Sequence, residues 1–164
     1  MTFYESIKSD FMKKSSKEQI KKIRISRWQL VCNPDICGGC RTCEAVCSLT
    51  KEDIVNPRLS RIQVVKDELG GYVSEAMPCK QCAGPECLFA CPTKALHVDE
   101  KTGARVIDAT KCSGCKLCIK ACIATPKRVY YNAEKKVAFK CDLCRGDPQC
   151  VKYCPTGALT YVKV

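Results

Sequence analysis

Cysteine is the residue type that could do most chemistry in this sequence, because 17 of the 164 residues are cysteines. Sixteen of them fall into four groups of closely similar spacing: Cys37, Cys40, Cys43 and Cys47; Cys79, Cys82, Cys87 and Cys91; Cys112, Cys115, Cys118 and Cys122; and Cys141, Cys144, Cys150 and Cys154. In every group, two residues separate the first two cysteines and three residues separate the last two. Thiolates this close in the chain are typical ligands of zinc or of an iron–sulfur cluster.

The spacing within the groups favours an iron–sulfur cube. The first and third groups read C-x2-C-x2-C-x3-C, which is the spacing that bacterial ferredoxins use for a [4Fe-4S] cluster. The second and fourth groups are the same motif with a longer middle loop and a proline after the last cysteine. The fourth cysteine of such a motif ligates the other cluster in two-cluster ferredoxins, so the groups are expected to work in pairs. All four groups keep all four cysteines, which predicts four [4Fe-4S] clusters and argues against a three-iron site.

Zinc and disulfides are the competing interpretations of so many cysteines. Structural zinc sites usually pair two C-x2-C knuckles across a longer loop or include histidine. Here the third cysteine follows within a few residues, and His97 is the only histidine. A disulfide framework would leave Cys32 unpaired and needs an oxidising compartment. The first 28 residues are basic and hold no apolar run long enough for a signal peptide or a membrane span, so we expect a cytoplasmic chain.

The formal charge of +11, from 28 basic and 17 acidic residues, would ordinarily indicate nucleic acid or an anionic membrane as a partner. That count treats every cysteine as neutral. An oxidised cube carries about +2 and its four thiolates about −4, so each site adds about −2. Four sites would bring the total to about +3. The basic residues are therefore better explained as compensation for anionic clusters, and no nucleic-acid partner is expected.

The segments between the groups must position the cysteines, and they contain a repeat. Residues 91–96 read Cys-Pro-Thr-Lys-Ala-Leu and residues 154–159 read Cys-Pro-Thr-Gly-Ala-Leu, and a short β-prone stretch follows each. An apolar stretch precedes the first group and another precedes the third. When the two are aligned on the first cysteine of each group, Cys32 falls opposite Ile107. This alignment predicts that Cys32 is an apolar strand position and no cluster ligand, since free cysteine often packs as a small hydrophobic residue.

Short hairpins and helices should complete the chain. The patterns predict hairpins that join residues 62–64 with 72–77, 96–98 with 105–107, and 129–131 with 137–139, and helices at 44–49 and 117–123. These elements are too small to build a conventional core. The clusters must therefore form the core, and the chain without iron is expected to be largely unfolded.

The four groups resemble those of the four-cluster ferredoxin subunits of molybdenum and tungsten oxidoreductases, a family that includes iron–sulfur subunits of carbon monoxide dehydrogenases and hydrogenases. The segments 37–47 and 56–62 are most similar to the small subunits of tungsten aldehyde oxidoreductases and class II benzoyl-CoA reductases. The resemblance covers residues 28–164 and implies an α+β, duplicated bacterial-ferredoxin-like fold. An inner unit, 79–122, would be inserted into an outer unit made of 28–78 plus 123–164.

The resemblance also implies a ligand set for each cluster, because in this family the first group pairs with the fourth and the second with the third. A sequential pairing of the groups stays open on the spacing alone. Two departures concern the backbone, since Ser48 and Ile123 stand where simple ferredoxins have proline. The implied sets are Cys37, Cys40, Cys43 and Cys154; Cys141, Cys144, Cys150 and Cys47; Cys79, Cys82, Cys87 and Cys122; and Cys112, Cys115, Cys118 and Cys91.

Catalytic machinery is not expected in this chain. The sequence has no nucleophile–base constellation, phosphate-binding loop or dinucleotide fingerprint, and His97 lies in a strand-like segment where a surface or packing role is favoured. The resemblance implies a non-catalytic relay that passes single electrons between a larger tungsten- or molybdenum-pterin subunit and a second redox partner, a flavoprotein or a ferredoxin. The alternatives are a free polyferredoxin shuttle, a relay subunit of a carbon monoxide dehydrogenase or hydrogenase, and, least favoured, an iron–sulfur sensor.

Residues 1–27 distinguish the bound relay from the free shuttle. They form a basic extension in which Phe3, Ile7 and Phe11 recur at helical spacing. One interpretation is a disordered, solvated tail without a binding role. The other interpretation is a segment that docks on a partner, and it favours a hetero-oligomer.

Overall fold

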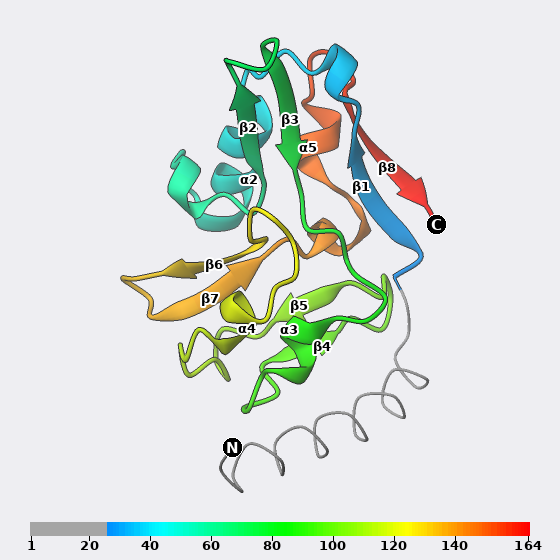
Figure 1. Ribbon diagram of the computed structural model, residues 1–164. Helices are drawn as coiled ribbons and strands as arrows, with labels where there is room; N and C mark the ends of the chain where they lie inside the picture. The colour runs from blue at the N-terminus through cyan, green and yellow to red at the C-terminus, as the bar shows by residue number, and fades with distance from the viewer. Residues whose placement is uncertain (1–25) are drawn as a thin grey trace, which may run out of the picture.

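The computed structural model describes residues 26–164. The basic extension to which the sequence assigns docking, residues 1–27, lies almost wholly outside this range. Within it, the strands form separate two-stranded antiparallel sheets with no continuous sheet among them (Figure 1). The pairs are β1 (Trp28–Cys32) with β8 (Leu159–Lys163), β2 (Gln63–Asp67) with β3 (Val73–Met77), β4 (Leu96–Val98) with β5 (Arg105–Ile107), and β6 (Val129–Asn132) with β7 (Val137–Lys140).

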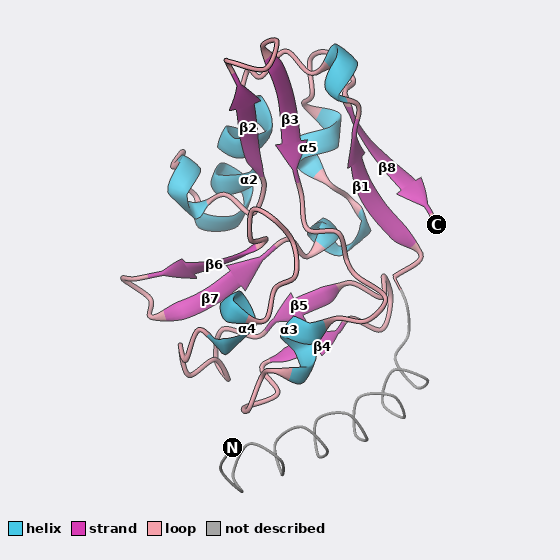
Figure 2. Ribbon diagram, viewed as in Figure 1, coloured by secondary structure: helices cyan, strands magenta, loops and turns pink. Residues whose placement is uncertain are grey.

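The helices are short, and loops make most of the connections (Figure 2). The longest is α2 (Thr42–Glu52), which contains the last two cysteines of the first group. Three helices of one turn follow the middle loops of the other groups: α3 (Glu86–Phe89), α4 (Leu117–Lys120) and α5 (Gln149–Lys152). Three 3₁₀ turns complete the list: Pro34–Ile36, Pro57–Leu59 and Leu143–Gly146. Short strands and few helices are the α+β arrangement expected of a ferredoxin-like domain.

All three predicted hairpins are present, whereas the two predicted helices differ in length. The α2 helix is longer than residues 44–49 at both ends, and residues in the left-handed region, Arg41 and Asp53, flank it. The α4 helix ends at Lys120, before residue 123, and the N–H of the following Ala121 still donates to the carbonyl of Leu117.

The β1–β8 pair brings together the two far ends of the described chain, and it repeats the geometry of the β4–β5 pair. Cys32 of β1 is opposite Leu159 of β8, and Ile107 of β5 is opposite Leu96 of β4. The two leucines are the equivalent positions of the sequence repeat. The repeat in the sequence is therefore also a repeat in strand pairing.

Buried cysteines lie among the apolar residues in two separate cores. The upper core in Figure 1 lies among α2, α5 and strands β1–β3 and β8, and the lower one among α3, α4, β4 and β5. The upper core contains Leu30, Ile62, Val64, Leu143 and Leu159 together with Cys43, Cys47, Cys79, Cys141 and Cys150. The lower core contains Leu96, Cys118, Val129 and Ala138.

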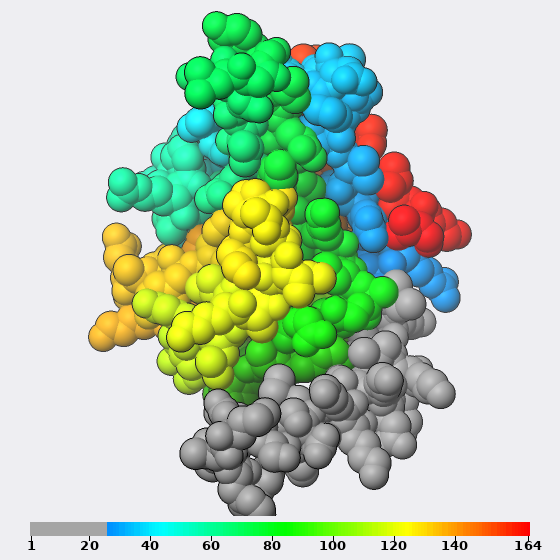
Figure 3. All heavy atoms as spheres, viewed as in Figure 1, coloured from blue at the N-terminus to red at the C-terminus, as the bar shows by residue number. Residues whose placement is uncertain are grey.

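The β6–β7 hairpin connects the two cores. Its Val129 and Ala138 belong to the lower core, while Lys135 in its turn pairs with Glu52 of α2 at 2.6 Å. Arg61 also pairs with Glu52, at 2.7 Å, and lies over the ring of Phe139 of β7. The segment between α4 and β6, drawn in yellow, covers the middle of the visible face (Figure 3). No helix among residues 26–164 is long and apolar enough to cross a membrane.

Candidate iron–sulfur centres

The sixteen cysteines of the four groups come together in four sets, and each set combines three cysteines of one group with the last cysteine of another. Three sets each line a cavity. These are the Cys112 cavity, lined by Cys112, Cys115, Cys118 and Cys91; the Cys79 cavity, lined by Cys79, Cys82, Cys87 and Cys122; and the Cys141 cavity, lined by Cys141, Cys144, Cys150 and Cys47.

The remaining four cysteines form the Cys37 set: Cys37, Cys40, Cys43 and Cys154. Cys154 lies within electrostatic range of Cys40, and Cys43 within range of Cys37 and Cys40. The three cavities group their cysteines as the family resemblance implies, with the first group joined to the fourth and the second to the third, and the ligand sets themselves stay a prediction.

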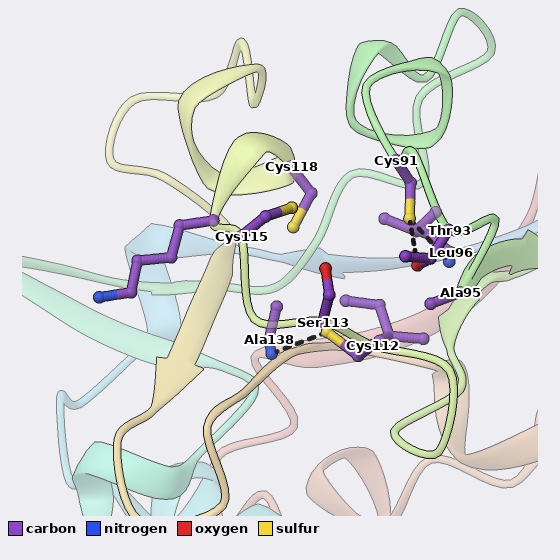
Figure 4. A pocket seen from close by; sticks show the side chains of 11 residues that line it. Cys91, Thr93, Ala95, Leu96, Cys112, Ser113, Cys115, Cys118 and Ala138 are labelled. Atoms are coloured by element: carbon purple, nitrogen blue, oxygen red, sulfur yellow. Dashed lines mark hydrogen bonds between the residues drawn. The ribbon is translucent and has the colours of Figure 1, made fainter.

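The Cys112 cavity shows how two segments share one site (Figure 4). Cys112 and Cys115 lie in the loop that leads into α4 and Cys118 lies in α4 itself, whereas Cys91 comes from a separate segment before β4. The N–H of Ala138 donates to the Sγ of Cys112 at 3.4 Å. Apolar side chains of β4, β5 and β7 complete the lining. The four sulfurs therefore surround one space that is largely closed by apolar atoms.

The spacing of the sulfurs bears on the kind of metal centre that a cavity could hold. Among residues 26–164, no three His, Cys, Asp or Glu side chains lie close enough together to hold one metal ion. A zinc site needs its four sulfurs about 2.3 Å from a single centre. A cube of four irons and four sulfides is larger and holds its four thiolates further apart. The separation of the sulfurs around a shared space thus fits a cluster.

Backbone N–H groups aimed at the sulfurs supply a second test of the fit. Each of the three cavities has a backbone N–H that donates to the sulfur of one of its cysteines, and the Cys112 cavity has two. Hydrogen bonds to the sulfurs are one of the means by which a protein stabilises and tunes an iron–sulfur cluster. The donors and acceptors are Arg61 and Cys47 at 3.3 Å, Leu96 and Cys91 at 3.4 Å, Arg128 and Cys122 at 3.4 Å, and Ala138 and Cys112 at 3.4 Å.

The tight wrapping of the loops depends on left-handed backbone. In the first and third groups, a glycine stands before the second cysteine and a basic residue after it, and both have positive φ: +62° and +61° at Gly39 and Arg41, +69° and +61° at Gly114 and Lys116. At Gly114, an added Cβ would overlap the carbonyl oxygen of Lys136 in the β6–β7 turn. Only glycine therefore permits this approach of the hairpin to the cysteine loop.

The thiols of one set have different environments. Burial raises the pKa of Cys43 and of Cys150 to about 12. Cys40 is exposed, and hydrogen bonds with the side chain and backbone of Thr42 lower its pKa below the usual value. The sulfur of Cys40 lies 3.3 Å from the Thr42 hydroxyl. The Cys37 set thus combines a cysteine enclosed by protein, Cys43, with one that reaches solvent, Cys40.

The four sets lie in series. In addition to burial, the pKa of Cys118 is raised by Cys87 of the next set, and that of Cys141 by Cys79. Cys43 of the Cys37 set likewise raises the pKa of Cys150, which belongs to the Cys141 set. These three pairs of neighbouring cysteines give the order of the sets: Cys112, Cys79, Cys141 and Cys37. The exposed cysteines, Cys115 and Cys40, belong to the two sets at the ends.

Cys32 lies at the end of β1 as its sequence predicts, and it is half-buried. Its Sγ accepts from the N–H of Ala76 at 3.3 Å, and it neighbours Cys37. Burial, followed by the neighbouring Cys37, raises its pKa to about 11. The structure adds the closeness to Cys37, which the strand pattern does not indicate.

Several polar residues around the sites have no signal in the sequence. Arg105, Arg128 and Lys140 are buried and line the Cys79 cavity. Glu44, directly after Cys43, is also buried, and its Oε1 accepts from the N–H of Val64 at 2.6 Å. In a strand or helix pattern, charged residues are expected at the surface. His97, by contrast, is exposed in β4, in agreement with a surface role.

Comparison with known proteins gives consistent results. The family model described as a 4Fe-4S dicluster domain matches residues 71–164. The chain is 46% identical over 137 residues to the aliphatic sulfonate oxidoreductase, polyferredoxin-like subunit, of Pyrococcus furiosus, covering 84% of this chain and 76% of that protein. It is 38% identical over 131 residues to the NADH-dependent phenylglyoxylate dehydrogenase subunit beta of Aromatoleum evansii, covering 79% of this chain but 29% of that subunit.

A solved structure is also similar, namely the active site complex BamBC of benzoyl coenzyme A reductase with benzoyl-CoA. The match is 24% identical with a TM-score of 0.48, and it covers 84% of this chain and 80% of the other.

Proposed function

This chain belongs to the 4Fe-4S dicluster family of electron-transfer subunits, and on that premise we propose that it carries single electrons through four [4Fe-4S] clusters in series. Each of the four cysteine sets would hold one cluster. When bound, the clusters supply the one-electron chemistry. We assign the substrate chemistry to another subunit, because the relatives are named as subunits of an oxidoreductase and of a dehydrogenase.

The observation that carries this proposal is the composition of the cysteine sets. Each cavity brings three cysteines of one group together with the fourth cysteine of its partner group. Under sequential pairing, Cys91 would join the first group and Cys122 the fourth. Instead, Cys91 lines the Cys112 cavity and Cys122 the Cys79 cavity. The geometry thus supports the nested pairing.

Strand pairing supports a duplicated fold with the inner unit, 79–122, inserted into an outer unit made of 28–78 plus 123–164. The β4–β5 pair lies within the inner unit, and the β1–β8 pair joins the two halves of the outer unit in the same register. The β6–β7 hairpin belongs to the outer segment by sequence, although it packs against β5 and α4 and covers the inner unit.

The proposed series of four clusters has an exposed cysteine at each end, and each end is suited to a partner. The Cys112 and Cys37 sets lie at opposite ends of the series, and Cys115 and Cys40 are exposed there. One end would face a larger catalytic subunit of the tungsten- or molybdenum-pterin type, and the other a flavoprotein or a ferredoxin. Two relatives are named as subunits of a sulfonate oxidoreductase and a phenylglyoxylate dehydrogenase. A hetero-oligomer in a reducing cytoplasm is the setting that we propose.

Iron content tests the number of clusters. Protein isolated under anoxic conditions should contain about sixteen irons and about sixteen acid-labile sulfides per chain, from four cubes. Stoichiometric zinc, or half of this iron, would contradict the proposal. Co-purifying subunits and their tungsten or molybdenum content, measured on the same preparation, would identify the partner class.

Two cysteine variants test the ligand assignment. Replacing Cys115 with alanine should lose one cluster or convert it to a three-iron form, because an exposed ligand of the Cys112 set is removed. The matched control is Cys32→Ala, which removes a thiol beside Cys37 but no proposed ligand. Iron and sulfide assays and EPR spectra distinguish the two. A whole cluster lost from the Cys32→Ala protein would show that the strand alignment is wrong.

A further inference from the structure

Three cationic side chains are buried around the Cys79 cavity. Arg105, Arg128 and Lys140 are 0%, 3% and 4% exposed, and all three line it. Arg105 is the first residue of β5, Arg128 directly precedes β6, and Lys140 is the last residue of β7. Strands from both sides of the cavity thus bring positive charge to one cysteine set.

The two guanidinium groups are only partly hydrogen-bonded. Nη1 of Arg105 donates to the carbonyl oxygen of Gly103 at 2.8 Å, and its Nε and Nη2 are buried without a partner. Nη1 of Arg128 donates to the carbonyl oxygen of Pro126 at 2.7 Å, and its Nε is buried without a partner. Arginine keeps its proton in proteins, so unsatisfied donors and positive charge both remain in the protein interior.

These cations have no ion-pair partner among the described residues. None of the ion pairs within residues 26–164 involves Arg105, Arg128 or Lys140. The one acidic residue in the cavity lining, Glu86, is exposed. A buried charge without a counter-ion is strongly unfavourable. The anion that these side chains face is therefore the cluster with its four thiolates, which carries about −2 when oxidised.

The other sets have different surroundings. In the Cys141 cavity, Lys51 pairs with Asp142 at 2.6 Å, and Arg61 pairs with Glu52. In the Cys112 cavity the cation is Lys116, which is exposed and lies over the ring of Tyr131.

At the Cys37 set, the buried charged neighbour is a carboxylate. Glu44 follows Cys43 directly, is 4% exposed, and has no partner for its Oε2. Buried and unpaired positive charge is therefore concentrated at the Cys79 set alone among the residues that the structure describes.

We propose that the cluster of the Cys79 set has the most positive reduction potential of the four, so that the first electron to enter the chain rests there. The inference builds on the proposed four-cluster relay. Reduction adds one negative charge to the cluster, and nearby cations stabilise the reduced form, more strongly where water is excluded. The electron would rest at an interior site next to the Cys112 set, shielded from solvent until a partner accepts it.

Redox titration of charge-neutral variants tests this inference. In the full chain with reconstituted clusters, an anoxic titration followed by EPR should show one cluster that is reduced before the others. Lys140→Met and Arg105→Gln should each lower its ratio of reduced to oxidised cluster at least tenfold at a given potential, a shift of about 59 mV for one electron. The other three clusters should not shift. The matched control is Lys116→Met, which removes an exposed lysine from the Cys112 cavity and should leave the potential of the first cluster to be reduced unchanged.

A ligand variant keeps the test decisive if a neutral variant fails to hold its clusters. Cys122→Ser should alter or abolish the EPR signal of the first cluster to be reduced, whereas Cys115→Ser should leave that signal in place. An unchanged first signal in Cys122→Ser overturns the inference. So does an unchanged first midpoint in Lys140→Met or Arg105→Gln protein that retains its full iron. Iron and sulfide content report separately on the four-cluster relay itself, so the two proposals fail in different measurements.

Discussion

Gln81 connects two of the cysteine sets through a single side chain. It lies in the loop between Cys79 and Cys82, is 1% exposed, and has a φ of +47°. Its Nε2 donates to the carbonyl oxygen of Cys141 at 2.8 Å, and its Oε1 accepts from the N–H of Arg105 at 2.8 Å. One amide therefore satisfies two backbone groups that belong to β5 and to the loop of the neighbouring set.

Replacing Gln81 with leucine should destabilise the protein, because it leaves the carbonyl of Cys141 and the N–H of Arg105 without these partners. Each unsatisfied group costs about 1–3 kcal/mol, so we expect the free energy of unfolding to fall by about 2–6 kcal/mol. The measurement is the midpoint of iron release in an anoxic guanidinium titration. The control is Gln149→Leu, since the amide of Gln149 donates to the exposed Asp147. Equal midpoints for the two variants would show that the Gln81 hydrogen bonds contribute nothing.

At the scale of elements, the β6–β7 hairpin and the Cys112 loop depend on each other through Gly114. Its φ is +69°, and its Cα faces the carbonyl oxygen of Lys136 at a distance that excludes a side chain. The same hairpin donates the N–H of Ala138 to Cys112. A strand pair that is marginal alone thus gains stability from the cysteine loop that it covers.

Gly114→Ala should weaken this contact and lower the occupancy of the adjacent site. The left-handed conformation costs a residue with a Cβ about 1–2 kcal/mol, and the overlap with Lys136 adds to that cost. We expect loss of up to about four irons per chain, from one cube, together with faster amide exchange in β6 and β7. Gly84→Ala is the matched control, because Gly84 has ordinary φ and no atom near an added Cβ. Full iron content in Gly114→Ala protein would contradict the expectation.

Much of the element order is predictable because each hairpin carries turn residues between β-prone stretches. The one-turn helices α3 and α5 are not, since four residues are too few to show a helical period.

The cysteine groups are also evident from spacing, whereas their nested pairing depends on which loops meet in space. Burial of Arg105 and Lys140 is unpredictable for another reason. A strand that ends in a charged residue has the same pattern whether that residue faces water or a cluster.

At the scale of the whole molecule, the strand pairs and cores of residues 26–164 depend on the proposed cluster sites. Its sheets are isolated pairs of strands, which are marginal in water. Both cores contain proposed cluster ligands among their buried residues. The clusters therefore connect segments that have little other reason to remain in place.

Removal of iron with a chelator under anoxic, reducing conditions should unfold most of the chain. Without the clusters, thiols and buried cations such as Arg105 lose the groups that they face, and metal binding is coupled to folding in such sites. Hydrogen exchange should show loss of protection in the β1–β8, β4–β5 and β6–β7 pairs together. Addition of iron and sulfide should restore it. Retained protection in the iron-free chain would show that apolar packing alone suffices.

The pairing of β1 with β8 has a consequence for biosynthesis. With the proposed ligand sets, all eight ligands of the inner clusters lie between Cys79 and Cys122, and they are available once that stretch has left the ribosome. The outer clusters need Cys47 with Cys150, and Cys37 with Cys154, so their sites stay incomplete until Cys150 and Cys154 have been synthesised. Iron–sulfur assembly on this protein should thus begin with the Cys112 and Cys79 sets, at one end of the proposed series of clusters, and finish at the Cys37 set at the other end. A nascent chain stalled before Cys141 would carry two clusters and four waiting thiols of the first group.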